Sequence, residues 1–478
     1  MPSPASELRP EAPAPATRET VQRPAADPEI NPLPAMPPRP AARLSTPQLL
    51  RVALSNTLAA CDEQLFEEPI VERRYVWGRF FSISDPDGIR RVMQDNVDNY
   101  PRIEVLHRIF AFTAGTGMLA AEGELWRRHR RVLNPTLDHR AVLADVPVIV
   151  ELSATLAEHL ARVPAGQEID IGAAFAHLVT AITGRVFAAD DRAIDPVLYR
   201  LGQYPGKYSL FDFVPAPAPF RFVERWRKSR GEIAEHIPLI DRLIAERRRP
   251  GYDGPQDLLW RIAAARDRQT GARLNEAELR DEILTLGATS ATPLRVFPWL
   301  WYLLATHPEA EARLHDELDR VLGRRSPSAD DLPNLIYLRQ IIDETLRLYP
   351  PAPTMLRSAV ADDVVCGRRV PRKSIVGVFP WVVHRHRTLW QAPDSFDPDR
   401  FAPNQVAARS RYAYLPFAIG PHVCIGASLA LVEITIAVAV LAQRFRFRLA
   451  PGQRVEPLAW TNLHPKGGIR MTVEPRDG

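Results

Sequence analysis

The stretch FAIGPHVCIG, Phe417 to Gly426, brings an aromatic ring, a histidine, a cysteine and two glycines together directly before a long apolar segment with a helical pattern. Because glycine has no Cβ, Gly420 and Gly426 allow tight turns and let backbone N–H groups approach the Cys424 sulfur. The cysteine precedes a helix N-terminus, whose dipole favours a negatively charged sulfur. Phe417 is placed to pack beside the sulfur and to keep water away. The stretch therefore predicts a thiolate that ligates a metal.

Cys424 is one of only three cysteines, and the other two, Cys61 and Cys366, are far from it in the chain. No CxxC pair occurs, so neither a disulfide framework nor a structural zinc site is supported. A single cysteine ligand implies a metal whose other positions are filled by something else, and haem provides such a metal. The alternative is a buried, inert cysteine in a tight turn, the usual state of a free cysteine.

Length and composition are typical of a soluble globular protein. The chain has 478 residues, of which 46% are apolar and 25% charged, enough for a large core. A formal charge of +4 without a basic stripe argues against nucleic-acid binding. The N-terminus shows no signal-peptide pattern, and no run of about 18 apolar residues predicts a transmembrane anchor. Together with the cysteine usage, these features favour a cytoplasmic location.

The sequence predicts one large domain over 45–478 that is mainly α with a small β portion. Residues 1–44 are rich in proline and alanine and predict a flexible tail, although NPLPAMPPRP could instead strap onto the body. Strand patterns occur at 75–84 and again at 357–381, and DPDGIRRVMQDN opens a helix with Asp-Pro. Helical periodicity is found at 122–134, 141–163, 171–187, 219–247, 277–306, 308–323 and 336–348.

Three further segments carry side chains suited to holding a cofactor or the core around it. Glu344 and Arg347 are one helical turn apart in ETLR, and FDPDRF places Arg400 between two phenylalanines. A guanidinium there would complete a Glu–Arg–Arg network with bidentate contacts to the carboxylate. In ELWRRHRRVL, Trp126 and Arg130 lie on one helix face, and their N–H groups suit the carboxylates of a cofactor. Taken alone, the Glu–Arg pair also fits an ordinary helix surface.

In this order and at this spacing, the motifs resemble those of the cytochrome P450 family, from about residue 45 to the end. The resemblance implies the P450 fold, haem b as the cofactor and Cys424 as the proximal iron ligand, whose thiolate favours O–O cleavage. His422 stands where many members have arginine, and a haem propionate should raise its pKa. The resemblance implies that Glu344, Arg347 and Arg400 are structural. The implied haem contacts are Trp126, Arg130, Arg357, Phe417, His422 and Gly426.

The helix predicted over 277–306 departs from the family pattern. Members usually carry an acid followed by an alcohol, which deliver protons to iron-bound oxygen. When the segment is aligned back from HPE, the alcohol is kept as Thr292, but the acid position is Ala291. Pro293 follows and predicts a kink, because proline removes a helical hydrogen bond.

Without the acid, proton delivery would run through Thr292, Ser290, water or substrate hydroxyls. The alternative for these hydroxyls and for Thr289 is hydrogen bonding to helix carbonyls around the kink. The missing acid also leaves open a haem-thiolate enzyme with other chemistry, such as peroxide-driven oxidation, rearrangement or dehydration. A third possibility is a haem-binding sensor without turnover.

The resemblance otherwise implies a monooxygenase that inserts one atom of O2 into an apolar organic substrate. Since no flavin or iron–sulfur domain is fused, electrons would come from separate proteins, a ferredoxin and its reductase. Arg127, Arg128 and Arg131 could dock an acidic ferredoxin or form a solvated helix face. The segment YSLFDFVPAPAPFRF is expected to form a lid over the substrate. The implied pocket, for which core packing is the alternative, comprises Leu106, Phe110, Leu286, Ala288, Thr289, Met355, Leu356 and Leu463.

Overall fold

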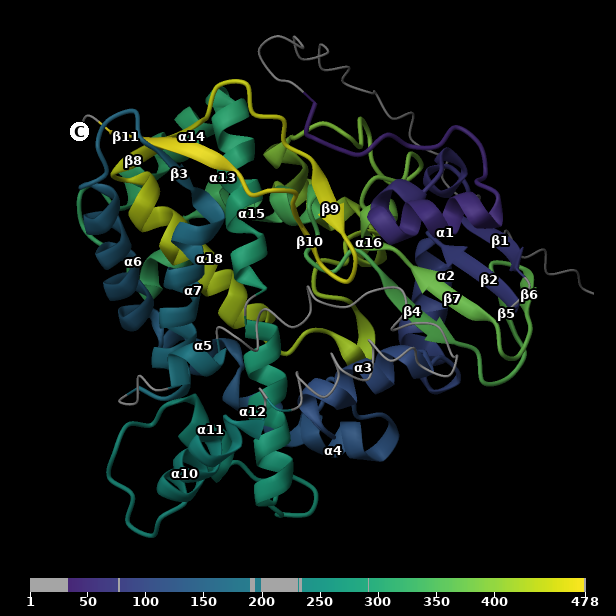
Figure 1. Ribbon diagram of the computed structural model, residues 1–478, viewed down its shortest axis with the longest axis horizontal. Helices are drawn as coiled ribbons and strands as arrows, with labels where there is room; N and C mark the ends of the chain where they lie inside the picture. Colours follow the sequence, from purple (N-terminus) through teal and green to yellow (C-terminus); the bar gives the residue numbers. More distant parts are fainter. Residues whose placement is uncertain are drawn as a thin grey trace, which may run out of the picture.

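The computed structural model describes residues 33–75, 78–189, 194–198, 231, 234–290 and 292–476. Figure 1 shows helices α6, α7, α14 and α18 gathered on one side of the molecule, opposite the sheet that contains β1, β2 and β7. The described chain is mainly α with a small β portion, as predicted. Among these residues, no helix combines the length and the apolar character needed to cross a membrane.

The α-helices are α1 Thr46–Ser55, α2 Pro86–Arg90, α3 Glu104–Ala114, α4 Gly123–Leu133, α5 His139–Leu143, α6 Val146–Leu160, α7 Ile171–Phe187, α10 Ile237–Arg247, α11 Leu258–Ala264, α12 Glu276–Ser290, α13 Phe297–Thr306, α14 Pro308–Val321, α15 Ile336–Leu348, α16 Pro380–Val383, α17 Pro403–Ala408 and α18 Ala427–Ala442. Short turns that concern the site are the π-turn η3 Arg91–Asp95 and the 3₁₀ turns η9 Pro293–Arg295, η11 Pro398–Phe401 and η13 Gly420–His422.

The strands are β1 Ile70–Tyr75, β2 Gly78–Ile83, β3 Glu168–Asp170, β4 Met355–Ser358, β5 Asp363–Val365, β6 Arg368–Val370, β7 Ile375–Val378, β8 Phe445–Leu449, β9 Pro457–Ala459, β10 Leu463–Pro465 and β11 Arg470–Pro475. The largest sheet has the order β1-β2-β7-β4, in which β2 and β7 are parallel and the other neighbours antiparallel. A second sheet has the order β3-β11-β8, and the pairs β9–β10 and β5–β6 are separate. Strands that are far apart in the sequence, such as β2 and β7, are therefore neighbours in the sheets.

Local sequence signals account for several helix boundaries. The Asp85 side chain accepts a hydrogen bond from the Gly88 N–H at 2.8 Å and so caps α2, which begins at Pro86 as predicted. The prediction of one helix over 141–163 was wrong, because the segment forms α5 and α6. Pro147 lies in the first turn of α6 and cannot continue a helix from α5.

The helix predicted over 277–306 is interrupted at the position of Pro293. It forms α12, the 3₁₀ turn η9 and α13, with the Thr292 N–H bonded to the Thr289 carbonyl at 3.2 Å. A buried pair fixes α12 against α4, since His129 Nδ1 lies 2.5 Å from Glu282 Oε1 and both side chains have 0% exposure. The helix that precedes the interruption, α12, is therefore fixed to α4 through this pair.

The segment before α1 lies against the body of the protein. The Tyr349 hydroxyl donates to the Ala35 carbonyl at 2.9 Å, and the Arg39 guanidinium lies 4.0 Å from the centre of the Phe66 ring. Arg39 also forms an ion pair with Asp394. Residues 33–44 thus adopt the strap that the sequence left open as the alternative to a tail. The rest of the predicted tail lies outside the described residues.

Candidate functional site

The cysteine loop joins η13 to α18 and turns back on itself. The Cys424 N–H donates to the Phe417 carbonyl at 2.8 Å, and Ala418 and Gly420 have φ values of +59° and +73°. Burial raises the pKa of the Cys424 thiol, whereas a hydrogen bond from the Gly426 N–H and the positive charge of Arg130 act in the opposite direction. Cys424 nevertheless has an exposed surface. A side chain that is surrounded by protein but faces an internal space shows both the burial that raises its pKa and an exposed surface.

The two glycines of the loop differ in what surrounds them. A Cβ on Gly420 would lie 2.1 Å from the Met93 carbonyl oxygen, so this position needs glycine both for its positive φ and for the close approach of η3. A Cβ on Gly426 would meet no atom within 4 Å. Gly426, whose N–H bonds to the Cys424 sulfur, therefore borders open space.

Positively charged side chains gather next to this space. Arg130 donates from Nη1 to the Val423 carbonyl at 2.7 Å, and Arg102 Nη2 lies 3.2 Å from His422 Nδ1. The rings of Trp126 and His422 have centroids 4.0 Å apart. An isolated β-bridge joins Arg102 to Arg357. The structure thus brings together the sequence-predicted residues Trp126, Arg130, Arg357 and His422.

Arg102 is a member of this group that the sequence did not reveal. It lies in YPRIEVL, where nothing in the spacing marks it, and it reaches the others only through the tertiary fold. Its Nη1 pairs with Glu122 Oε1 at 2.9 Å. Within the part of the chain that the structure describes, Arg130 and Arg357 have no such acidic partner.

The electrostatics of the group indicate a missing negative charge. Burial and the neighbouring Arg102 lower the pKa of Arg357 to about 10. Burial, Arg102, Arg357 and Arg130 lower the pKa of His422 to about 3. An arginine pKa falls only where the charged form is poorly stabilised. A bound anion would relieve this repulsion, and its charge would raise the pKa of His422 in the direction expected from the sequence.

The Glu344, Arg347 and Arg400 side chains form a network on α15 and η11. Arg347 donates to Glu344 through Nε at 2.5 Å and Nη2 at 2.8 Å, and Arg400 Nε lies 3.4 Å from Glu344 Oε1. Both Glu344 and Arg347 have 0% exposure. Arg347 also donates to the carbonyls of His384, Pro393 and Ser395. These bonds tie the segment before the cysteine loop to α15.

The hydroxyls of Thr289, Ser290 and Thr292 all bond to carbonyls three or four residues earlier in the chain. The Oγ atoms of Ser290 and Thr292 donate to the Gly287 and Thr289 carbonyls, each at 2.8 Å, and Thr289 Oγ1 donates to the Thr285 carbonyl at 3.0 Å. The bonding to helix carbonyls that the sequence left open is therefore present. The Thr289 and Thr292 residues are also exposed, so their oxygens remain able to accept bonds from water. Ala291 lies outside the described residues.

The residues expected to line a substrate pocket fall into two groups. Leu106, Phe110, Met355 and Leu356 are half-buried and Thr289 is exposed, as suits side chains that face a cavity. Leu286, Ala288 and Leu463 are buried, with 7%, 6% and 0% exposure, which matches the core-packing alternative. The expected lid, residues 208–222, lies outside the described residues.

The three surface arginines of α4 each have an acidic partner. Arg127 pairs with Asp98 at 2.6 Å, and Arg131 pairs with Asp267 at 3.0 Å. Arg128 pairs with Glu278. The charge of this face is therefore balanced within the protein, as in a solvated helix face.

Comparison with known proteins identifies the family. The family model described as Cytochrome P450 matches residues 37–471. The chain belongs to the cytochrome P450 family. The chain is 34% identical over 374 residues to cyclooctatin synthase of Streptomyces melanosporofaciens, covering 76% of this chain and 79% of that protein. It is 30% identical over 426 residues to cyclooctat-9-en-7-ol 5-monooxygenase of the same organism, covering 85% and 88%.

The fold of the P450 family is also present in the structure. The crystal structure of the cytochrome P450DA heme domain has a TM-score of 0.76 to this chain, covering 93% of this chain and 98% of that one at 22% identity. The chain is therefore a cytochrome P450 monooxygenase, an oxidoreductase with haem b as its cofactor. This assignment does not agree with the third possibility raised by the sequence, a haem-binding sensor without turnover.

The site has the features that haem b requires. An exposed thiol stands in an enclosed space, and Gly426 leaves room beside it. Next to this space lie arginines without acidic partners, which suit the two carboxylates of the porphyrin. When bound through a cysteine thiolate, haem b supplies the redox chemistry that activates O2. The residues of this chain position that group and control the protons and water around it.

Proposed function

We propose that this P450 inserts one atom of O2 into an apolar organic substrate, with electrons from separate redox proteins. The observation that carries the proposal is the arrangement around Cys424, where an accessible sulfur faces arginines that lack acidic partners. Cys424 is the proposed iron ligand. The Gly426 N–H bond to its sulfur stabilises the thiolate and lowers its pKa.

In the same proposal, Trp126, Arg130, Arg357 and His422 hold the haem carboxylates, and Arg102 supports His422. Phe417 and Gly426 border the haem face next to the cysteine. Glu344, Arg347 and Arg400 are proposed to have a structural role, because Glu344 and Arg347 are fully buried against each other and Arg400 lies beside Glu344. The described domain is proposed to run from residue 45 to the end, with 1–44 preceding it.

For proton delivery we propose Thr292 and Ser290, acting with water. Each hydroxyl donates its own proton to a helix carbonyl, so each accepts a bond from water through its oxygen. Thr292 would thereby hold a water molecule in place at the exposed side of the kink. The alternative proposal follows from Ala291: without an acid at that position, the enzyme uses peroxide directly or catalyses a rearrangement or a dehydration.

The proposed substrate is a largely hydrocarbon molecule of the terpenoid type. The relatives named above act, by their names, in the oxidation of cyclooctat-9-en-7-ol and the formation of cyclooctatin. The half-buried side chains Leu106, Phe110, Met355 and Leu356 are apolar and suit such a molecule. A ferredoxin and ferredoxin reductase are the proposed electron donors, and a cytoplasmic location is proposed on the cysteine usage.

Two linked measurements test this function. We expect the dithionite-reduced protein to bind carbon monoxide and to show the absorption band typical of thiolate-ligated ferrous haem. Cys424→Ser should lose the band, whereas Cys366→Ser, at another exposed cysteine, should keep it. Turnover of a terpenoid alkene is then compared with NAD(P)H, ferredoxin and reductase or with peroxide alone. Product formed only with peroxide would exclude the O2-dependent reaction, and a band retained by Cys424→Ser would exclude the proposed ligand.

A further inference from the structure

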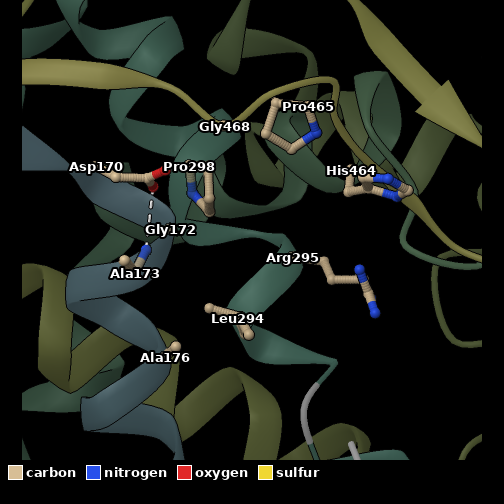
Figure 2. A pocket seen from close by; sticks show the side chains of 10 residues that line it. All are labelled: Asp170, Gly172, Ala173, Ala176, Leu294, Arg295, Pro298, His464, Pro465 and Gly468. Atoms are coloured by element: carbon tan, nitrogen blue, oxygen red, sulfur yellow. Dashed lines mark hydrogen bonds between the residues drawn. The ribbon is translucent and has the colours of Figure 1, made fainter. Parts of the chain in front are cut away.

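A second cavity lies where α7, η9 and β10 meet. It has a volume of about 260 Å³ and is lined by ten residues. Figure 2 shows Arg295 and His464 on one side of it and Asp170 on the other, with Leu294 and Ala176 forming part of its wall. No residue of the proposed haem site lines this cavity.

Arg295 is a half-buried cation without a partner. In the part of the chain that the structure describes, its guanidinium forms neither an ion pair nor a hydrogen bond. Burial lowers the pKa of its guanidinium, and no carboxylate opposes the effect. Arginine carries five N–H donors in a fixed planar fork, and the described protein uses none of those of Arg295. They are therefore available to a ligand in the cavity.

The same pattern occurs at a place where an anion is expected. Arg130 and Arg357, beside the proposed haem site, also lack acidic partners, and burial lowers the pKa of each. Arg102, by contrast, is paired within the protein, with Glu122 at 2.9 Å. Arg295 therefore shares its chemistry with the arginines that face the carboxylates of a cofactor. It lies in a cavity where no haem group is expected.

The other walls limit the kind of anion that fits. Burial and the positive charge of Arg295 lower the pKa of His464, so the ring is uncharged at neutral pH. Its Nδ1 lies 3.3 Å from the Asn462 carbonyl, which takes the single N–H of the neutral ring. Asp170 already caps α7, with Oδ1 accepting from the Ala173 N–H at 3.1 Å. Its negative charge disfavours a dianion such as phosphate. Pro298 and Leu294 make the wall between these ends apolar.

We propose that this cavity binds a small organic carboxylate, with the carboxylate on Arg295 and a short hydrocarbon body against Leu294 and Pro298. Arginine favours carboxylates because its fork matches their two oxygens. The volume of about 260 Å³ lies below the roughly 300–1,000 Å³ of pockets for drug-sized ligands. It equals about nine water molecules at about 30 Å³ each, so the ligand is of the size of octanoate.

The carboxylate has two possible sources, a substrate that extends to this cavity or a separate small acid. Arg295 follows Thr292 by three residues in the same kinked segment. A carboxylate that belongs to a substrate would therefore also change the haem absorption spectrum on binding. A separate acid would bind with no change in that spectrum. The spectrum thus distinguishes the sources without measuring turnover.

The test is calorimetric titration of the haem-loaded full chain with octanoate, 1-octanol and inorganic phosphate. We expect octanoate to bind at least tenfold more tightly than either 1-octanol or phosphate. Arg295→Met should weaken octanoate binding at least tenfold, and Arg295→Lys should restore part of it. The matched control is Arg320→Met, which removes an arginine whose side chain is 71% exposed, and it should leave binding unchanged.

Thermal unfolding supplies a readout that does not depend on a ligand. Because Arg295→Met removes an unpaired cation, we expect it to retain or raise the melting temperature in the absence of octanoate. Octanoate should raise the melting temperature of the wild-type protein and not that of Arg295→Met. The proposal is overturned if 1-octanol or phosphate binds as tightly as octanoate, or if Arg295→Met binds octanoate with wild-type affinity. Neither result would bear on Cys424 or on the proposed oxidation.

Discussion

Replacement of Gly420 by alanine tests the packing of the cysteine loop against η3. The added Cβ would lie 2.1 Å from the Met93 carbonyl oxygen, more than 1 Å inside an ordinary contact. Met93 has 1% exposure, so its backbone has little freedom to move away. Alanine at φ +73° is also strained. We expect the free energy of unfolding to fall by about 2–5 kcal/mol, from about 1–2 for the left-handed backbone and about 1–3 for overpacking.

The assay is urea unfolding of the haem-loaded protein, followed by far-ultraviolet circular dichroism and by haem absorbance. Gly452→Ala is the matched control, because its φ is +70° and its Cβ would meet no atom within 4 Å, so it carries the backbone strain without the Met93 contact. We expect that variant to lose only about 1–2 kcal/mol. A loss below about 1 kcal/mol in Gly420→Ala, or equal losses in the two variants, would refute the argument from the Met93 contact.

Two further predictions concern buried charge and pH. Glu344→Ala leaves the guanidinium of Arg347, with 0% exposure, without its carboxylate, so we expect a loss of about 3–5 kcal/mol in urea unfolding; a loss under about 1 kcal/mol would contradict the network. Burial and the nearby Arg476 lower the pKa of His315 in the folded protein to about 4, whereas an unfolded chain has a histidine pKa of about 6.5. Between pH 4 and pH 6.5, about where the two pKa values lie, the unfolded state therefore binds more protons than the folded state. Stability should therefore fall as the pH drops from about 6.5 to about 4, and His315→Gln should flatten that part of the profile; an unchanged profile would contradict the shift.

The cysteine loop and several helix boundaries could be predicted from the sequence because their causes are local. Asp85 caps a helix through a neighbour three residues away, and Pro293 interrupts a helix through its own ring. The single helix expected over 141–163 is divided for the same local reason, because Pro147 in the first turn of α6 cannot continue a helix from α5. The P450 motifs likewise lie within short stretches, so their order along the chain is visible without a structure.

Other features join segments hundreds of residues apart, and no spacing in the sequence reveals them. Arg102 meets His422 across 320 positions, and the acidic partners of Arg128 and Arg131 on α4 lie beyond residue 260. Those partners neutralise a face that the sequence alone left open as a docking surface.

The chain order alone therefore determined the family, the haem-binding loop and the kink beside it, because each depends on neighbours within a few residues. Only the tertiary structure decided which cations have partners. Among the residues that the structure describes, the Arg295 side chain has none, and Arg347 lies in a closed network. The charge balance of a side chain depends on everything packed around it, and that environment exists only once distant segments have come together.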